Sequence, residues 1–595
     1  MEARVRGRSR RRLAICEKRQ RLSAAQAASR YSSMIRASLE GTYRAAERLI
    51  PTRRWPHLAV LALLALCASA GSKASTAATR AQRPAARPTP VVMIVFDEFP
   101  TTSLLDRSGR IDATRYPSFA ALAGASTWFR YATASVDETG RAMEALLTGS
   151  TPPDRKRPAN YQHNPRNIFT LLGSRYRVRA SEEVTSMCPH RLCPSVRAKD
   201  RRYVLHELAR GRAERFERWV AGLRPDARPT FYFKHVLLPH VPLRYLPSGR
   251  YYGTSAHEVV PGVTRAFHDR WLVGQIYQRH LLQLGFTDRL LGLVLRRLHG
   301  TGLWDRALLV VTADNGESFG RFGDRHVITK RKAADIALTP LFIKLHRQRR
   351  GRVDRRLVRT VDVLPTMARA LGLKIPWRTE GMRLVGRPVA PARKWITLHE
   401  RSGGAFTRTL AELRSEEQRS LRRKFALFGE GNERPGIYGL GPARSLLGLP
   451  LPLSPTPALP LRILLNGQRY LRSVRPRAGF VPAYLTGRIL GSAPTTHRDV
   501  VVAVNGRVAA TARTYHLTGG RQEFFSALVP ESVLGRGPNR VEVLPLSSGA
   551  RLIRAPRPGV TDSPPDTPTP ASQPPRGPPA DRDRCVNARP SRRGR

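Results

Sequence analysis

The chain has 595 residues, of which 103 are Lys or Arg and 44 are Asp or Glu, so its formal net charge is +59. Hydrophobic residues make up 41%, which is enough for a large buried core and excludes a wholly disordered chain. Five cysteines in this length exclude a disulfide-stapled scaffold. The sequence has no run of 18 or more apolar residues, which argues against a multi-span membrane protein.

The positive charge suggests an anionic partner, such as nucleic acid, anionic lipid or an anionic polymer. However, Arg supplies 92 of the 103 basic residues, a bias that GC-rich coding produces without any binding role. The charge is also spread along the chain, and neither zinc-finger spacing nor an RNA-binding aromatic strand accompanies it. We therefore predict no specific nucleic-acid partner.

The N-terminal region reads as a targeting segment. Residues 1–56 form a basic leader, and residues 57–71 contain an apolar run of 13 residues, Leu58 to Ala70. This run is short for a membrane span and typical of a secretory signal that is cleaved at the end of the run. The chain then either carries a long leader before the signal or begins later, at Met34. An uncleaved membrane anchor is the alternative. Either way, we expect an exported or membrane-anchored protein, with any membrane association through residues 57–71.

Residues 89–385, which follow a linker at 72–88, are predicted to form an α/β catalytic domain. Strand-like apolar runs alternate with helical patterns, at residues 91–96, 231–238, 307–312 and 338–345. This alternation predicts a mostly parallel sheet covered by helices.

The C-terminal part changes character. Residues 386–470 read as a connecting region, and residues 471–553 as a small antiparallel β domain in which Asn505-Gly506 is a hairpin turn. Residues 554–595 are rich in Pro and are predicted to be a disordered tail.

Two of the predicted strands end in acidic residues. Asp97 and Glu98 follow the first strand, and Asp314 and Asn315 follow the strand that begins at 307. In parallel sheets ligands bind at the carboxyl ends of strands, and hard cations prefer carboxylate oxygens. A helix cap or a turn residue is the alternative for each Asp.

A hydroxyl and two imidazoles occupy comparable positions. Thr139 precedes a helix-like stretch that ends at Gly149, and unpaired backbone N–H groups at such a helix start attract anions. A plain Thr helix cap is the alternative. His235 and His240 flank the end of another apolar strand, which modestly favours a site over a structural role.

Cys188 and Cys193 lie close together in the segment CPHRLC. In an exported protein a local disulfide closing this loop is the favoured interpretation. A metal-binding pair stays open, although the spacing is not CxxC and no second pair exists.

The order of these segments resembles the sulfatase-like branch of the alkaline phosphatase superfamily, over roughly residues 89–385. The matching segments are VVMIVFDEFP, the nucleophile position Thr139 ten residues before the Gly of ALLTG, TADNGE, VDVLPTMARALG and EGMRL. The segment HVLLPHVP resembles extracytoplasmic members, in which His contacts the substrate anion. The resemblance implies an alkaline-phosphatase-like fold.

The resemblance also implies one divalent metal ion, bound by Asp97, Thr139 and Asp314, with Asn315 as a further ligand. Relatives that act on phosphate esters usually have His at that last position. An amide oxygen favours Mg, Ca or Mn over Zn, so the ion is expected to be one of these four with its identity open.

The nucleophile position departs from true sulfatases, which carry a (C/S)xPxR motif whose first residue becomes formylglycine. Here the stretch is TGRAM, and Thr139 cannot form that aldehyde. Thr resembles instead the branch that transfers phospho-groups through a covalent intermediate. Arg141, His235 and His240 then bind the anion or protonate the leaving group, whereas His326 is interpreted as a loop residue outside the core site.

We therefore predict an extracytoplasmic metal-dependent hydrolase or transferase that acts on phosphate or sulfate esters through a covalent Thr intermediate. A cell-envelope polymer or a lipid head group suits the expected location and charge. The alternative is a catalytically inactive relative that binds envelope polymer, because Asn315 and Gly140-Arg141 depart from the family pattern.

Overall fold

The computed structural model describes residues 89–546. Its gaps are residues 153–156, 197–203, 205–210, 253–268, 321–322, 387–390, 402, 431–435, 452–461, 492–496 and 517–520. The predicted leader, the segment 57–71, the linker 72–88 and the tail 554–595 lie outside the described residues. Within the described ranges, no helix is long and apolar enough to cross a membrane.

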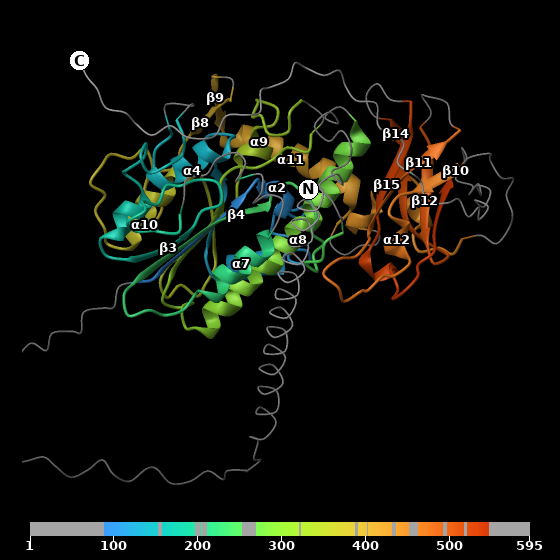
Figure 1. Cartoon of the computed structure of the whole chain (residues 1–595). Helices are drawn as coiled ribbons and strands as arrows, with labels where there is room; N and C mark the ends of the chain where they lie inside the picture. Colours follow the sequence, from blue (N-terminus) through green and yellow to red (C-terminus); the bar gives the residue numbers. More distant parts are fainter. Residues whose placement is uncertain are drawn as a thin grey trace, which may run out of the picture. The chain divides into compact units, whose positions relative to one another are not determined.

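A seven-stranded sheet organises the region that was predicted to be catalytic (Figure 1). In spatial order its strands are β3 (Arg177–Ser181), β4 (Thr230–Pro239), β1 (Val91–Asp97), β5 (Leu308–Ala313), β6 (Leu341–Lys344), β2 (Thr127–Thr133) and β7 (Arg352–Arg359). Only β6 runs antiparallel to its neighbours, and every other adjacent pair is parallel. The mostly parallel sheet is therefore confirmed, and the four predicted strands are β1, β4, β5 and β6.

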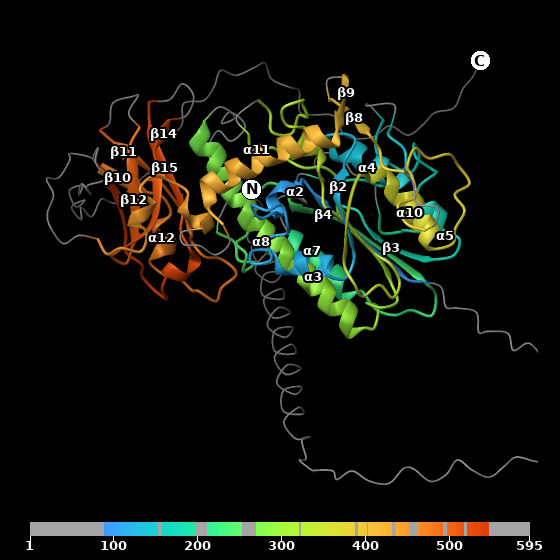
Figure 2. The same cartoon turned by 180° about the vertical axis from the view of Figure 1, so that it is seen from behind.

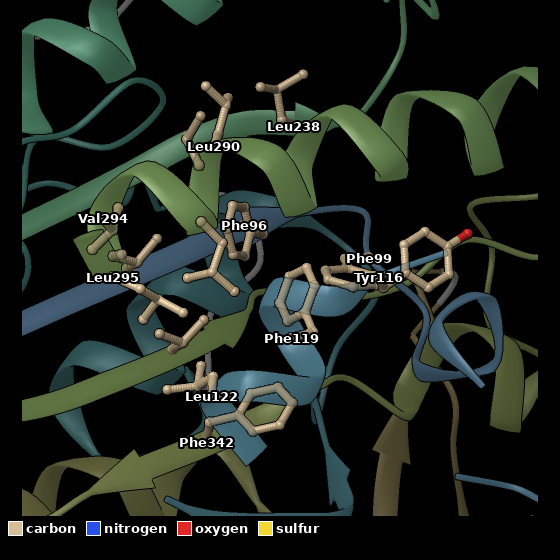
Figure 3. Packing of buried hydrophobic residues seen from close by; sticks show 14 of the residues in the cluster. Phe96, Phe99, Tyr116, Phe119, Leu122, Leu238, Leu290, Val294, Leu295 and Phe342 are labelled. Carbon is tan, nitrogen blue, oxygen red and sulfur yellow. The ribbon is translucent and has the colours of Figure 1, made fainter. Parts of the chain in front are cut away.

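Strand β1 is an almost uninterrupted apolar run because both faces of the sheet are covered. Val92, Ile94 and Phe96 pack on one face with residues of α3 (Pro117–Ala123), α7 (Arg212–Ala221) and α8 (Arg270–Gly300). Figure 3 shows Phe96 in this cluster with Phe119 of α3 and Leu295 of α8. Figure 2 shows these three helices side by side.

The alternate residues of β1, Val91, Met93 and Val95, pack on the opposite face. The helices there are α4 (Thr139–Thr148), α5 (Ile168–Gly173) and α10 (Val363–Ala370). With each face of β1 buried, the strand is rigid and its carboxyl end is held in one place, which is where Asp97 lies.

The region predicted to be a connector contributes to the same core. It contains the hairpin β8 (Trp395–His399) and β9 (Ala405–Thr409), followed by α11 (Leu410–Phe428). Leu421 and Phe425 of α11 belong to the cluster that also contains α8 residues. Lys424 donates to the carbonyls of Thr102 and Ser103, at 3.1 Å each. These two residues lie in the short helix α2 (Thr101–Leu104), close to α9 (Ala333–Ala337).

The C-terminal part is antiparallel, as predicted. One sheet holds β10 (Arg462–Leu465), β11 (Tyr484–Leu490), β15 (Glu523–Leu528) and β14 (Tyr515–His516); the other holds β13 (Arg507–Arg513), β12 (Asp499–Val504) and β16 (Val541–Pro545). Asn505 and Gly506 have φ values of 52° and 79° and join β12 to β13, which confirms the hairpin turn. The short elements are η3 (Thr360–Asp362), η4 (Gly436–Gly439), η5 (Arg444–Leu446), α12 (Gln468–Leu471) and η6 (Glu531–Val533).

The structure joins Cys188 to Cys193 in a disulfide, as the loop spacing predicted. The preceding Glu182 fixes this loop, because its carboxylate accepts from the backbone N–H groups of Met187 and Cys188 at 2.9 Å each.

Candidate functional site

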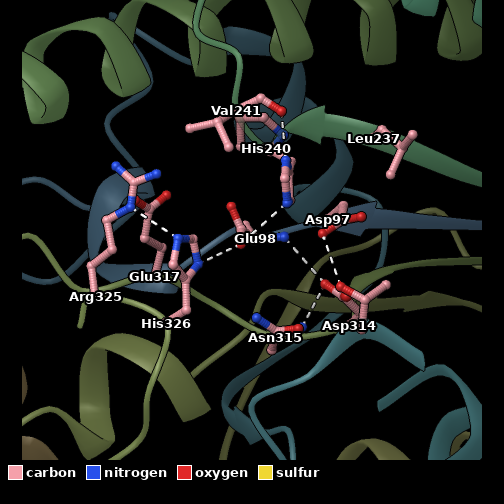
Figure 4. Close-up of polar contacts among 12 residues, drawn as sticks. Asp97, Glu98, Leu237, His240, Val241, Asp314, Asn315, Glu317, Arg325 and His326 are labelled. Carbon is pink, nitrogen blue, oxygen red and sulfur yellow. Dashed lines mark hydrogen bonds and ion pairs between the residues drawn. The ribbon is translucent and has the colours of Figure 1, made fainter. Parts of the chain in front are cut away.

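The carboxyl ends of β1 and β5 meet at one edge of the sheet, as predicted (Figure 4). Glu98, the residue after β1, has φ of 54°, a left-handed conformation that costs a non-glycine residue about 1 kcal/mol. Its backbone N–H donates to Oδ1 of Asp314 at 3.2 Å, so the turn links the two acidic strand ends. Backbone strain of this kind is concentrated at functional sites.

The residues after β5 present oxygen atoms at the same edge. The Asn315 N–H donates to Oδ1 of Asp314 at 2.6 Å, and its amide Nδ2 donates to the Gly316 carbonyl at 3.0 Å. The Asn315 Oδ1 is left buried without a hydrogen bond. Gly316 is required here, because a Cβ atom would lie 2.3 Å from the carbonyl oxygen of Asp335.

Thr139 is the first residue of α4, and its hydroxyl lies 3.4 Å from Oδ1 of Asp97. The helix cap, however, is Glu138, whose carboxylate accepts from the N–H groups of Gly140 and Arg141. This corrects both interpretations of the helix start: Thr139 is not the cap, and these two N–H groups are not left unpaired for an anion. Glu138 occupies the N-cap position, one residue before Thr139, and its side chain reaches forward to these N–H groups.

His235 lies beside the carboxylates. Its Nε2 is 3.6 Å from Oδ2 of Asp97, and both ring nitrogens are buried without a hydrogen bond. Burial lowers the pKa of His235 to about 3, so the ring is neutral and keeps a lone pair. One ligand atom each from Asp97, His235 and Asp314 all lie within 4.8 Å of one another, a geometry that suits a metal ion. The expected role of His235, binding the substrate anion or protonating the leaving group, stays a prediction, and its place beside the two carboxylates was not predicted.

The two carboxylates destabilise each other in the absence of a cation. Burial raises the pKa of Asp97 well above its ordinary value, and the neighbouring Asp314 raises it further. Burial likewise raises the pKa of Asp314 to about 7. Unpaired buried oxygens of Asp97, Asp314 and Asn315 converge here, so these donors fit a divalent cation that prefers oxygen ligands.

A second group of polar side chains surrounds Glu98 (Figure 4). Oε1 of Glu98 lies 3.3 Å from Nε2 of His240 and 2.6 Å from Nδ1 of His326. Burial opposes ionisation of Glu98, but His240 and His326 outweigh it and hold the pKa of the carboxyl far below its ordinary value. The sequence analysis weighed His326 as a further candidate and left it out of the core site as a loop residue, because GDRH carries no pattern that places it here.

Two further residues support this group. Nε of Arg325 lies 2.9 Å from Oε1 of Glu317 and donates to Nε2 of His326 at 3.0 Å. Burial raises the pKa of Glu317 to about 7, although Arg325 opposes the shift. The sequence signal for Glu317 was its place in TADNGE, directly after the ligand candidates.

The guanidinium of Arg141 is buried and donates to the Pro152 carbonyl at 3.3 Å. Its predicted contact with the substrate anion stays a prediction.

Residues 90–373 match the family model "Sulfatase". Among curated proteins, the multifunctional alkaline phosphatase superfamily protein PehA of Trinickia caryophylli is 33% identical over 118 residues, which is 19% of this chain and 22% of PehA. The chain therefore spans about a fifth of the length of this curated relative. Residues 90–373 are thus similar to the sulfatase family, and over these residues the resemblance stated from the motifs is confirmed.

Solved structures include two similar folds. The 2-O GAG sulfatase BT1596 is 14% identical with a TM-score of 0.42, covering 57% of this chain and 89% of that protein. The phosphonate monoester hydrolase of Agrobacterium radiobacter is 16% identical with a TM-score of 0.37, covering 57% of this chain and 93% of that protein.

Proposed function

We propose that the protein is a divalent-metal-dependent hydrolase or transferase of phosphate or sulfate esters, with Thr139 as the covalent nucleophile. The single observation that carries this proposal is the position of the Thr139 hydroxyl, 3.4 Å from Asp97 in the group of buried carboxylates. The similarity to the sulfatase family supports an ester hydrolase.

Asp97 and Asp314 would hold the ion, with the amide oxygen of Asn315 and the neutral imidazole of His235 as further donors. A bound divalent ion would polarise the ester oxygens and lower the pKa of a coordinated hydroxyl. This donor set holds three oxygen side chains, which favours Mg, Ca or Mn, but His235 adds a ligand that Zn and Mn accept.

The chain's own groups then divide the work in two steps. In the first, Oγ of Thr139 bonds to phosphorus and its hydroxyl proton passes to the Asp97 carboxylate, 3.4 Å away, while the bond from phosphorus to the ester alcohol breaks. The alcohol leaves with a proton, for which His240 and His326, both beside Glu98, are candidate donors. In the second step, water or an acceptor alcohol bonds to phosphorus and gives its proton to that same histidine, while the bond from phosphorus to Oγ of Thr139 breaks and Oγ regains its proton from Asp97; water gives hydrolysis, and an alcohol gives transfer.

We favour phosphate esters over sulfate esters, because Thr139 cannot become the aldehyde on which true sulfatases depend. Asp97, Asp314 and Thr139 form a site at the carboxyl ends of the strands. This site requires of its substrate only an anionic, tetrahedral group. An exported or membrane-anchored protein with this site would meet phosphate esters in cell-envelope polymers and lipid head groups. The basic composition and the apolar run at residues 57–71 support that location.

The test is turnover of four 4-nitrophenyl probes: the phosphate monoester, the bis-ester, the phenylphosphonate and the sulfate, each with Mn, Mg, Ca or Zn. Thr139→Ala should lose at least about 1,000-fold in kcat, whereas Thr139→Ser should retain measurable turnover. Thr148→Ala, at the other end of α4, is the matched control and should stay near the parent. Near-parental turnover by Thr139→Ala would contradict the nucleophile assignment.

The second candidate is an inactive relative that binds envelope polymer. Asn315 favours it, because phosphate-ester relatives usually have His at that position, and Glu138 favours it by occupying the first amides of α4. Metal binding without turnover on any probe, together with retention on purified cell-wall polymer, would select this candidate.

A further inference from the structure

Two buried side chains, Arg212 and Gln283, form hydrogen bonds with the backbone of the segment that carries His240. Nη1 of Arg212 donates to the carbonyls of Leu237 and His240, at 2.8 and 2.7 Å. Nη2 of Arg212 donates to the carbonyl of Pro242 at 2.5 Å. Arg212 is the first residue of α7, so one helix start holds one carbonyl near the end of β4 and two of the chain that follows it.

Gln283 of α8 holds the same segment from another side. Its Nε2 donates to the carbonyls of Pro239 and His240, at 2.9 and 2.8 Å. Its Oε1 accepts from the N–H groups of Arg244 and Tyr245, at 2.9 and 3.3 Å. The His240 carbonyl therefore receives hydrogen bonds from both α7 and α8.

These contacts are energetically unusual for a merely structural role. Arg212 is 2% exposed, and Gln283 is fully buried. Among the described residues Arg212 makes no salt bridge; the Tyr245 ring, 5.5 Å from its guanidinium carbon, and the backbone carbonyls contact it, and the Glu183 carboxylate acts on its charge from a greater distance. Burying a charge without a counter-ion in contact is costly, and an apolar side chain would fill the space at a lower cost.

The held backbone sets the direction of the His240 imidazole. Nδ1 of His240 lies 2.6 Å from the carbonyl oxygen of Val241, which leaves Nε2 to face Glu98 at 3.3 Å. Because that carbonyl lies between those of His240 and Pro242, both of which Arg212 holds, a shift of the segment would turn the ring away from the site. We propose that Arg212 and Gln283 are positioning residues that fix His240 against Glu98; the effect on catalysis rests on the proposed function.

Two variants test this, Arg212→Met and Gln283→Leu, with Arg212→Lys as the milder form should Arg212→Met fail to fold. The matched control is Arg297→Met. Arg297 of α8 also donates to two backbone carbonyls, those of Leu223 and Ala221 at 2.8 and 2.9 Å, but at the far end of α7.

The first readout is hydrogen–deuterium exchange of peptides spanning residues 237–245, which needs no turnover. The amides of Arg244 and Tyr245 should exchange at least about tenfold faster than in the parent in the Arg212 and Gln283 variants. In Arg297→Met their exchange rate should equal that of the parent. Unchanged exchange in both variants overturns the proposal even if the protein proves to be no esterase.

The second readout is a double-mutant cycle with His240→Asn on whichever 4-nitrophenyl probe the parent turns over. Arg212→Met should lower kcat by about 10- to 100-fold in the parent. The same change should cost less than about twofold when His240 is already Asn, because the residue it positions is gone. Equal losses in both backgrounds overturn positioning through His240. Absence of turnover in the parent would contradict the proposed function and leave the exchange experiment to decide this inference.

Discussion

His326 and Glu98 meet at a distance of 2.6 Å, between Nδ1 of the imidazole and Oε1 of the carboxylate. Burial alone would lower the pKa of His326, but the Glu98 charge outweighs it and raises the pKa above the ordinary value. A residue from a loop after β5 is thus favoured in its charged form beside the turn that follows Asp97.

Replacing His326 tests this placement. His326→Ala should lower kcat/KM on the 4-nitrophenyl probes by about 100-fold, the usual effect of losing a proton donor or an anion contact. The control is His346→Ala, since His346 is exposed and its Nδ1 contacts only the Arg306 carbonyl at 3.2 Å. Equal activity of the two variants would remove His326 from the site.

The disulfide gives a prediction about compartment and stability. In protein recovered from the exported compartment, neither Cys188 nor Cys193 should react with an alkylating reagent until a reductant is added. Cys188→Ser with Cys193→Ser should lose about 2 kcal/mol of unfolding free energy, because closing a short loop removes little chain entropy. Free alkylation of both residues without reduction would contradict the bridge, and the melting temperature of the pair of variants measures the loss.

Much of the fold was predictable because it depends on local patterns. The apolar run that ends at Asp97 predicted a strand covered on both faces, and Asn505-Gly506 predicted the hairpin turn between β12 and β13. The antiparallel direction of β6 was not predictable, since its apolar residues look the same in either direction. The hairpin β8–β9 was missed because its outward-facing residues weaken the alternation.

The candidate site was likewise predictable only where it depends on local patterns. Asp97, Asp314 and Asn315 were found because strand ends at one sheet edge must lie close together. His326 was left outside the core site, and Arg212 was not predicted, because they contact Glu98 and the backbone at His240 from segments far apart in sequence. Glu138 was missed for a different reason: the cap of α4 is decided by one side-chain conformation that composition does not fix.

Acid should weaken the fold through Glu183. Burial opposes its ionisation, but Lys234 and Arg215 outweigh it and lower the pKa of Glu183 from 4.5 to about 2. Arg215 contacts both carboxylate oxygens, at 3.0 and 3.1 Å, and Lys234 is its second partner. A lowered folded-state pKa gives stability that is present above pH 4.5 and is lost as the pH falls toward 2.

Denaturant unfolding between pH 6 and pH 3 measures this effect. The shift corresponds to at most about 3 kcal/mol, so the parent should lose stability steeply below pH 4.5. Glu183→Gln should be less stable at neutral pH, where the buried Lys234 loses the Glu183 charge, and should show a flatter pH dependence. Glu214→Gln, an exposed carboxylate on α7, is the control and should follow the parent. If the stability of Glu183→Gln depended on pH as steeply as that of the parent, Glu183 would not be the cause of this dependence.

The candidate metal site predicts how many divalent ions the protein binds. Purified protein should bind about one divalent ion per chain, and Asp97→Ala with Asp314→Ala should bind none. Asp305→Ala with Glu430→Ala, which removes two exposed carboxylates, should bind like the parent. Elemental analysis after incubation with Mn, Mg, Ca or Zn and removal of free ions measures this stoichiometry. No ion in the parent with any of these metals would favour the inactive relative.

The stronger test is thermal stability at pH 8, with a chelator or with the preferred ion. Without an ion, Asp314 must be ionised beside Asp97 in a buried site although burial raises its pKa to about 7, a cost that the unfolded chain does not have. Asp314→Asn should therefore melt above the parent in chelator. With ion at about 100 times its dissociation constant, the parent should gain about 2.7 kcal/mol, and Asp314→Asn should gain much less. A variant that melts below the parent in both conditions would show that Asp314 stabilises the fold by itself, without a cation.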